Sequence, residues 1–102
     1  ISQVPVVPGA VIRCRPVDAG RMEDKAGKDE KVLTVPVDAL HPFYTGVASY
    51  RDLPAEMLEQ IGHFFQHYKD LEKGKWVTIV RWVDTADAER IIMEGIARVK
   101  GL

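Results

Sequence analysis

Several features that would narrow the function of a protein are scarce in this sequence of 102 residues. It has one cysteine, Cys14, which excludes an internal disulfide. The 14 basic and 15 acidic residues give a net charge of −1, so no overall charge attracts nucleic acid or a membrane surface. No apolar run is long enough to span a bilayer, and the first residues do not have the pattern of a secretory leader. We therefore expect a cytoplasmic protein with neither nucleic acid nor a membrane as a partner.

The composition is typical of a folded globular domain. Hydrophobic residues make up 46% and charged residues 28%, and the length suffices for one modest core, so we expect residues 1–102 to form a single domain. Cys14 alternates with Ile12 in a strand-like run, which predicts a buried thiol in a reducing cytosol rather than a catalytic thiol. The first residue is Ile1 and not Met, so we expect the chain to be part of a longer protein.

The first half of the sequence alternates with a period of two. This pattern predicts a strand over residues 11–17 and another over residues 31–37. The same alternation recurs once in the second half, where it predicts a third strand over residues 75–83. The first two would form a hairpin, with the charged residues 21–31 as the loop at its tip. Residues 38–52 are rich in turn formers and predict an irregular connection.

In the second half the apolar period becomes helical. It predicts an amphipathic helix over residues 54–71, with Asp52 or Leu53 as its cap, and a second one over residues 85–100 with Gly101 as its C-terminal cap. The fold class is therefore α+β. Three strands leave two open sheet edges and too little area to cover both helices, so we expect partner strands from another copy or from an upstream segment.

The charged segment RMEDKAGKDEK, residues 21–31, carries four acids and four bases and so has no net charge. One interpretation is a solvated hairpin tip, where mixed charge contributes only solubility. The other follows from the order of Asp24, Asp29 and Lys31, which could hold a divalent cation and a phosphate oxygen together. The local pattern leaves both interpretations open.

The first predicted helix carries two polar patterns. His63 and His67 have the spacing of a helical metal pair, but the glutamate that follows the first histidine in zinc hydrolases is absent, so we expect histidines that are solvated or at the edge of the core. Tyr68 lies on the apolar stripe beside Lys69, which predicts a tyrosine ring in the core with its hydroxyl at the surface, next to a lysine that could bind phosphate. The alternative is a solvated helix end whose lysines complement the helix dipole.

Three segments carry a resemblance to a known family. PGAVIRCRPV, MEDKAGKDEKVLTVP and DLPAEMLEQIGHFFQHYKDLEKGKW, in this order and spacing, resemble the soluble family I inorganic pyrophosphatases, particularly the bacterial ones, over nearly the whole chain. The resemblance implies the C-terminal portion of an enzyme that hydrolyses pyrophosphate to two phosphates with Mg²⁺. It also implies part of a small OB-like β-barrel with two amphipathic helices, and a homo-oligomer that is a hexamer in the family.

The same resemblance implies roles for five residues. Asp24 and Asp29 match the family's magnesium ligands. Lys31, Tyr68 and Lys69 match its phosphate contacts and would be the catalytic and substrate-binding residues.

The sequence also departs from the family pattern. The family's upstream aspartate cluster has no counterpart in these residues, and Lys25 and Lys28 stand where members frequently carry acids. Asp18, Ala19 and Gly20 replace an aliphatic stretch, which we expect to weaken the packing that holds the charged loop. We therefore expect these 102 residues alone to be weakly active or inactive. Two interpretations remain: part of a magnesium-dependent pyrophosphatase, or a catalytically silent relative that serves as a binding or assembly module.

Overall fold

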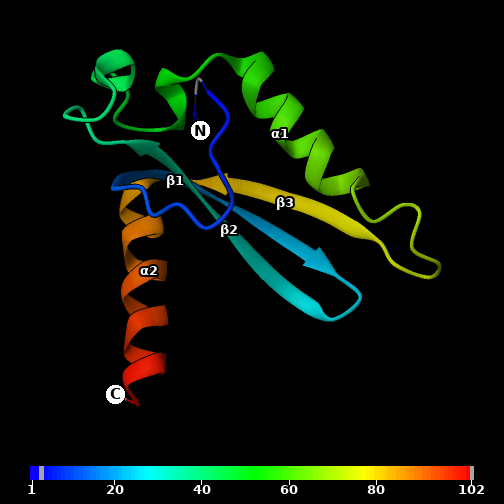
Figure 1. The fold of residues 1–102 in the computed structure, drawn as a ribbon. Coiled ribbons are helices and arrows are strands. Elements are labelled where there is room, and N and C mark those ends of the chain that lie inside the picture. The colour runs from blue at the N-terminus through cyan, green and yellow to red at the C-terminus, as the bar shows by residue number, and fades with distance from the viewer. Residues whose placement is uncertain (3, 102) are drawn as a thin grey trace.

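The structure is a computed structural model that describes residues 1–2 and 4–101, without the side chain of Val80. Along the chain the elements are β1 (Cys14–Asp24), β2 (Gly27–Pro36), two short 3-10 helices (Pro42–Tyr44 and Tyr50–Asp52), α1 (Ala55–His67), β3 (Val77–Val83) and α2 (Thr85–Lys100). The predicted α+β class is confirmed (Figure 1).

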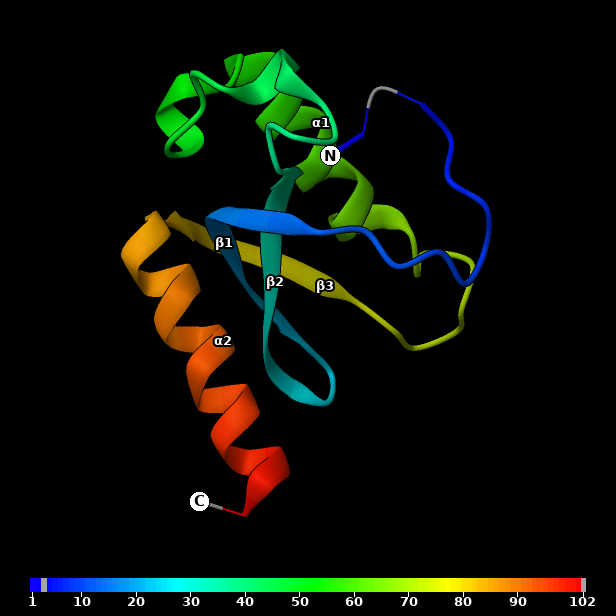
Figure 2. The same cartoon turned by 60° about the vertical axis from the view of Figure 1, so that its left-hand side comes forward.

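The three strands form one antiparallel sheet in the order β2-β1-β3. The two long helices lie on opposite sides of this sheet, α1 above it and α2 below it in Figures 1 and 2. The outer strands β2 and β3 do not pair with each other, so the described sheet is open and does not close into a barrel. An open sheet with two helices is compatible with part of a small OB-like barrel.

Strands β1 and β2 form the predicted hairpin, but two details differ from the prediction. The expected strand over residues 11–17 starts later, at Cys14, and the segment predicted as a loop is mostly strand. Its charges face each other across the hairpin, because Arg21 pairs with Glu30 and Glu23 pairs with Lys28. Opposite charges on paired strands stabilise the pairing, so this mixed composition suits a strand as well as a loop.

The turn of the hairpin consists of Lys25 and Ala26. The carboxylate of Asp24 accepts a hydrogen bond from the Ala26 amide at 2.9 Å, which is an Asx turn. Gly27 follows with a φ of 126°, a conformation that strains any residue with a Cβ. The turn therefore holds Asp24 at the end of β1.

Residues 17–20 form the most deeply buried part of β1, so the stretch that departs from the family pattern is packed within the sheet. Ala19 packs in a cluster with Val83 and Ala88, the last from α2. A Cβ on Gly20 would lie 3.1 Å from the Trp82 ring, so the glycine leaves the space that this ring occupies. The small residues thus allow β3 and α2 to lie close against β1.

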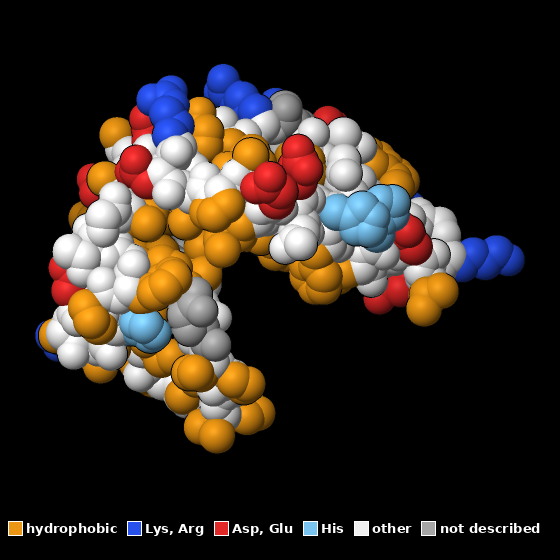
Figure 3. Space-filling view, turned by 90° about the horizontal axis from the view of Figure 1, so that it is seen from above, with side chains coloured by type: hydrophobic (Ala, Val, Ile, Leu, Met, Phe, Trp, Pro, Cys, Tyr) orange, Lys and Arg blue, Asp and Glu red, His pale blue; other side chains and the backbone are white. Residues whose placement is uncertain are grey.

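Helix α2 matches its predicted range of 85–100, and Gly101 caps it with a φ of 72°. Helix α1 ends at His67, one turn earlier than predicted, and none of its residues is buried. Phe64, for example, is 59% exposed, and hydrophobic side chains lie at the surface in Figure 3. The exposed stripe agrees with the expectation that three strands offer too little area to cover both helices. Helix α1 contacts the outer strand β3, and a three-stranded sheet is too narrow to cover it.

Cys14 is exposed, so the predicted buried thiol is wrong. It lies at the start of β1, opposite Pro36 of β2. Strand β3 reaches only as far as Ala19, where it pairs through Val83. The first residues of β1 are therefore covered along one edge alone.

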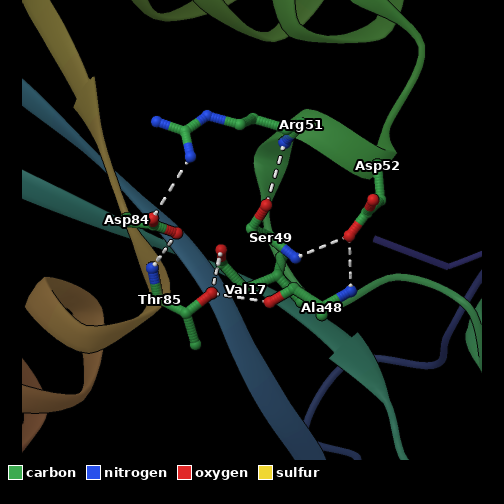
Figure 4. Close-up of polar contacts among 7 residues, drawn as sticks. All are labelled: Val17, Ala48, Ser49, Arg51, Asp52, Asp84 and Thr85. Carbon is green, nitrogen blue, oxygen red and sulfur yellow. Dashed lines mark hydrogen bonds and ion pairs between the residues drawn. The ribbon is translucent and has the colours of Figure 1, made fainter.

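A polar junction fixes the connection that leads into α1 (Figure 4). The Thr85 hydroxyl lies 2.8 Å from the Val17 carbonyl and 2.6 Å from the Ala48 carbonyl. Asp84 accepts a hydrogen bond from the Thr85 amide at 2.8 Å and caps α2, while Asp52 accepts one from the Ala48 amide at 2.9 Å. The junction joins β1, α2 and the loop before α1.

Across residues 1–2 and 4–101, no helix combines the length and apolar character needed to cross a membrane.

Candidate functional site

The hairpin brings Asp24, Asp29 and Lys31 to one of its two faces. Met22 pairs with Asp29, and partners across an antiparallel pair project to the same side. Asp24 lies two residues after Met22 and Lys31 two residues after Asp29, and side chains two apart on a strand share a face. The spacing seen in the sequence is thus a geometric relation between two strands.

The end of α1 supplies Tyr68 and Lys69 to the same region. Tyr68 is the C-cap residue of α1, and Lys69 follows it in a turn. The ammonium group of Lys69 lies 3.3 Å from Asp24 Oδ2 and 5.4 Å from the centre of the Tyr68 ring. One predicted phosphate contact, Lys69, therefore lies between the other, Tyr68, and a predicted metal ligand, Asp24.

A second pair lies on the neighbouring strand. The ammonium group of Lys31 lies 3.1 Å from Asp29 Oδ2 and 5.9 Å from the centre of the Phe65 ring. The sequence analysis did not predict this contact with Phe65. The spacing of three residues between Phe65 and Tyr68 was the available signal, because it places both rings on one side of α1.

The Tyr68 ring is not in the core, which corrects the prediction. Its side chain is 44% exposed, and the ring lies parallel to Phe64 at 5.6 Å and edge-on to Phe65 at 5.9 Å. The reason is the narrow sheet, which leaves the end of α1 uncovered. Tyr68 therefore packs against other aromatic rings, and its side chain remains accessible.

Charge stabilises the ionised forms of Asp24 and Lys69. Partial loss of water raises the pKa of Asp24, but the Ala26 amide and Lys69 outweigh it and hold this pKa below its usual value. Hydrogen bonding to Tyr68, and then to Asp24, raises the pKa of Lys69. The pair is thus a carboxylate beside an ammonium ion at neutral pH.

A hollow of about 360 Å³ lies beside this pair. Its lining includes Asp24, Lys69, Lys25 and Lys75, with Trp76 at its apolar side. Three ammonium groups around one carboxylate favour an anion such as phosphate. Asp29 lines a separate hollow, so the structure places the two aspartates on one face but not in one cavity.

His63 and His67 are exposed, as predicted, and their rings lie 4.3 Å apart. His67 Nδ1 lies 2.8 Å from a carboxylate oxygen of Asp70. Histidine side chains are visible at the surface in Figure 3. Within residues 1–2 and 4–101, no three or more histidine, cysteine or acidic side chains cluster closely enough to hold a metal ion.

Comparisons with known protein sequences all match this chain to one family. The family model for inorganic pyrophosphatase matches residues 1–100. The inorganic pyrophosphatase of Caulobacter vibrioides is 60% identical over 98 residues, which are 96% of this chain and 55% of that protein. The one from Bradyrhizobium diazoefficiens is 57% identical over 95 residues, 93% of this chain and 53% of that protein.

Solved structures agree with the sequence comparison. Inorganic pyrophosphatase from Helicobacter pylori superposes with a TM-score of 0.95 at 34% identity, over 98% of this chain and 59% of that one. The crystal structure from Thermus thermophilus gives a TM-score of 0.91 at 36% identity, over 98% of this chain and 57% of that one. The chain spans about half the length of the relatives it matches, in agreement with the resemblance to a C-terminal portion. Matched along nearly its whole length in sequence and in fold, the chain belongs to the inorganic pyrophosphatase family.

Proposed function

We propose that the protein containing this chain hydrolyses inorganic pyrophosphate to two phosphates with the help of Mg²⁺. The observation that supports this proposal is the arrangement of two carboxylate–ammonium pairs, Asp24 with Lys69 and Asp29 with Lys31, on the surface between the hairpin and the end of α1. In this proposal the aspartates bind the metal, and the lysines bind phosphate oxygens together with the hydroxyl of Tyr68.

The donor chemistry of the two aspartates fits magnesium. Each offers hard oxygen ligands, and each has one oxygen oriented by a backbone amide, that of Ala26 for Asp24 and that of Glu30 for Asp29. Magnesium takes one or two carboxylates and keeps several waters. When bound, the ion neutralises phosphate charge and makes its bound water more acidic.

The chain's own residues bind and orient the substrate. Lys31 and Lys69 carry the positive charge that the phosphate oxygens require, and each would be available to them if its aspartate held a metal ion. Tyr68 lies within reach of Lys69 and presents an accessible side chain. Its hydroxyl would donate a hydrogen bond to the same phosphate group.

Two carboxylates are few for pyrophosphate hydrolysis, in which electrostatic stabilisation is the main contribution of the enzyme. We therefore propose that the 102 residues alone are weakly active or inactive, and that further chain or another copy completes the site. In the described residues the outer edges of β2 and β3 are open to additional strands. A homo-oligomer, or an upstream segment that adds strands, would cover them.

A second candidate is a catalytically silent member that binds phosphate. The observation that favours it is that each aspartate is already neutralised by a lysine, so the surface holds together without a metal. Magnesium-dependent phosphate release by the intact protein would exclude this candidate, and binding of inorganic phosphate without any release would support it.

The test compares Asp29→Asn with Tyr68→Phe in the intact protein. Asp29→Asn removes a charge that the ion needs, so it should raise the magnesium requirement and lower turnover. Tyr68→Phe removes only a hydroxyl from an accessible ring, so it should raise KM for pyrophosphate and leave stability nearly unchanged. Asp38→Asn is the control, because Asp38 is exposed and lies outside the site.

Rates are measured against magnesium at saturating pyrophosphate, and against pyrophosphate at saturating magnesium. A magnesium curve that is the same for Asp29→Asn and the parent protein contradicts the metal role. A Tyr68→Phe variant that is less stable but has an unchanged KM for pyrophosphate contradicts the phosphate role.

A further inference from the structure

The two lysines of the site each lie against an aromatic ring of α1. Lys31 faces Phe65 at 5.9 Å and Lys69 faces Tyr68 at 5.4 Å, measured from the nitrogen to the ring centre. The two rings touch edge to face, with centres 5.9 Å apart and an interplanar angle of 89°. Two adjacent rings on one helix thus each contact a different ammonium group.

Lys31 is held differently from Lys69. Its ammonium pairs with Asp29, which lies on the same strand and is half exposed, so this ion pair alone holds it weakly. Its side chain has four rotatable bonds and reaches α1 only through Phe65 among the described contacts. A ring face attracts an ammonium ion within about 6 Å. Phe65 therefore supplies the second point that fixes where the charge of Lys31 lies.

We propose that Phe65 is a positioning residue for Lys31. Its ring keeps the ammonium group on the surface shared by Asp24, Asp29 and Tyr68, where a phosphate oxygen of the substrate would meet it. The phosphate ligand rests on the proposed function, whereas the contact between ring and lysine stands independently of it. Phe65 acts through Lys31 and does not touch substrate.

The neighbouring Phe64 provides a matched control. Its ring contacts both Phe65 and Tyr68, at 5.2 and 5.6 Å, and is 59% exposed. No cation–ring contact involves Phe64 in the described chain. Loss of the Phe64 ring therefore perturbs the aromatic cluster without removing a lysine contact.

The experiment uses the intact protein with Phe65→Leu, Phe65→Tyr and Phe64→Leu. Phe65→Met is a second variant without a ring, in case the leucine variant does not fold. The first readout is the NMR shift of the Lys31 ε protons, assigned by their loss in Lys31→Arg. A ring face moves such protons upfield, so the shift should disappear in Phe65→Leu and persist in Phe65→Tyr and Phe64→Leu.

The second readout is the affinity for inorganic phosphate, together with KM and kcat for pyrophosphate. Phe65→Leu should weaken phosphate binding and raise KM by about two- to five-fold, the range of an exposed cation–ring contact, while kcat changes less. Phe65→Tyr should restore both values, because it keeps the ring face.

Three results would overturn the proposal. One is a Lys31 proton shift that is unchanged in Phe65→Leu. Another is an equal loss of phosphate affinity in Phe64→Leu, which would assign the effect to general packing. The third is unchanged phosphate affinity and KM in Phe65→Leu. Absence of pyrophosphate hydrolysis in the parent protein would instead refute the proposed function, and the shift and phosphate affinity would still decide the role of Phe65.

Discussion

Replacing Asp18 with asparagine should stabilise the protein above pH 6. Asp18 lies on β1 with a fully buried side chain, the only buried polar or charged residue among those described. One carboxylate oxygen accepts a hydrogen bond from the Ala19 amide at 2.7 Å, and the other has no hydrogen-bond partner in the described residues. Burial raises the pKa of Asp18 to about 6, against the lowering effects of the Ala19 and Val83 backbone amides and with a further contribution from the charge of Asp84.

The size and sign follow from this pKa. The difference between the ordinary value of 3.8 and about 6 in the fold corresponds to about 3 kcal/mol. Below pH 3.8 the folded and unfolded states both hold the proton, so Asp18 costs nothing. The free energy of unfolding then falls as pH rises from about 4 to about 6, because only the folded state keeps the proton, and the full cost is present above pH 6.

Asp18→Asn keeps the shape of the side chain and an oxygen for the Ala19 amide, but carries no charge. We expect it to raise the free energy of unfolding at pH 7.5 by about 1–3 kcal/mol and to leave it nearly unchanged at pH 4. Urea unfolding between pH 4 and pH 8 measures this difference, with the exposed Asp38→Asn as the control. Asp84→Asn removes a charge that raises the pKa of Asp18, so it should lower the upper end of the pH range over which the protein loses stability. An equal gain at pH 4 and pH 7.5, or a loss at pH 7.5, would refute the argument from charge.

Three further changes test the packing, each measured by the free energy of unfolding. Gly20→Val should destabilise by about 1–3 kcal/mol and change the fluorescence of Trp82, since even a Cβ would lie 3.1 Å from that ring; an unchanged protein would show that the ring moves freely. Gly62→Ala should stabilise by about 0.5–1 kcal/mol, because an added Cβ in this helical position meets nothing within 4 Å, and a loss would indicate an unseen neighbour. Thr85→Val should cost about 1–3 kcal/mol, because it removes the one hydroxyl proton that the Val17 and Ala48 carbonyls share, whereas Thr85→Ser keeps that proton and should cost much less. Equal costs would mean that the methyl group contributes as much as the hydroxyl and would contradict this argument.

The sequence by itself determined the local elements. Helical period and a glycine cap are properties of neighbouring residues, which is why the range of α2 was predicted correctly. The alternation around Val35 likewise placed β2, and the segments near Asp24 and Lys69 showed the family resemblance. Each of these signals depends on residues close together in the chain, where propensity and periodicity act.

Only the tertiary structure decided what covers each element. The charged residues around Arg21 and Glu30 predicted a loop from their local sequence. Only the pairing of these two residues across the hairpin shows that the segment is a strand. Cys14 and the stripe of α1 are exposed because β3 is too short and the sheet too narrow to cover them. Phe65 reaches Lys31 although the two are 34 positions apart in the chain. Burial and long-range contacts depend on how elements pack against one another, which no local pattern specifies.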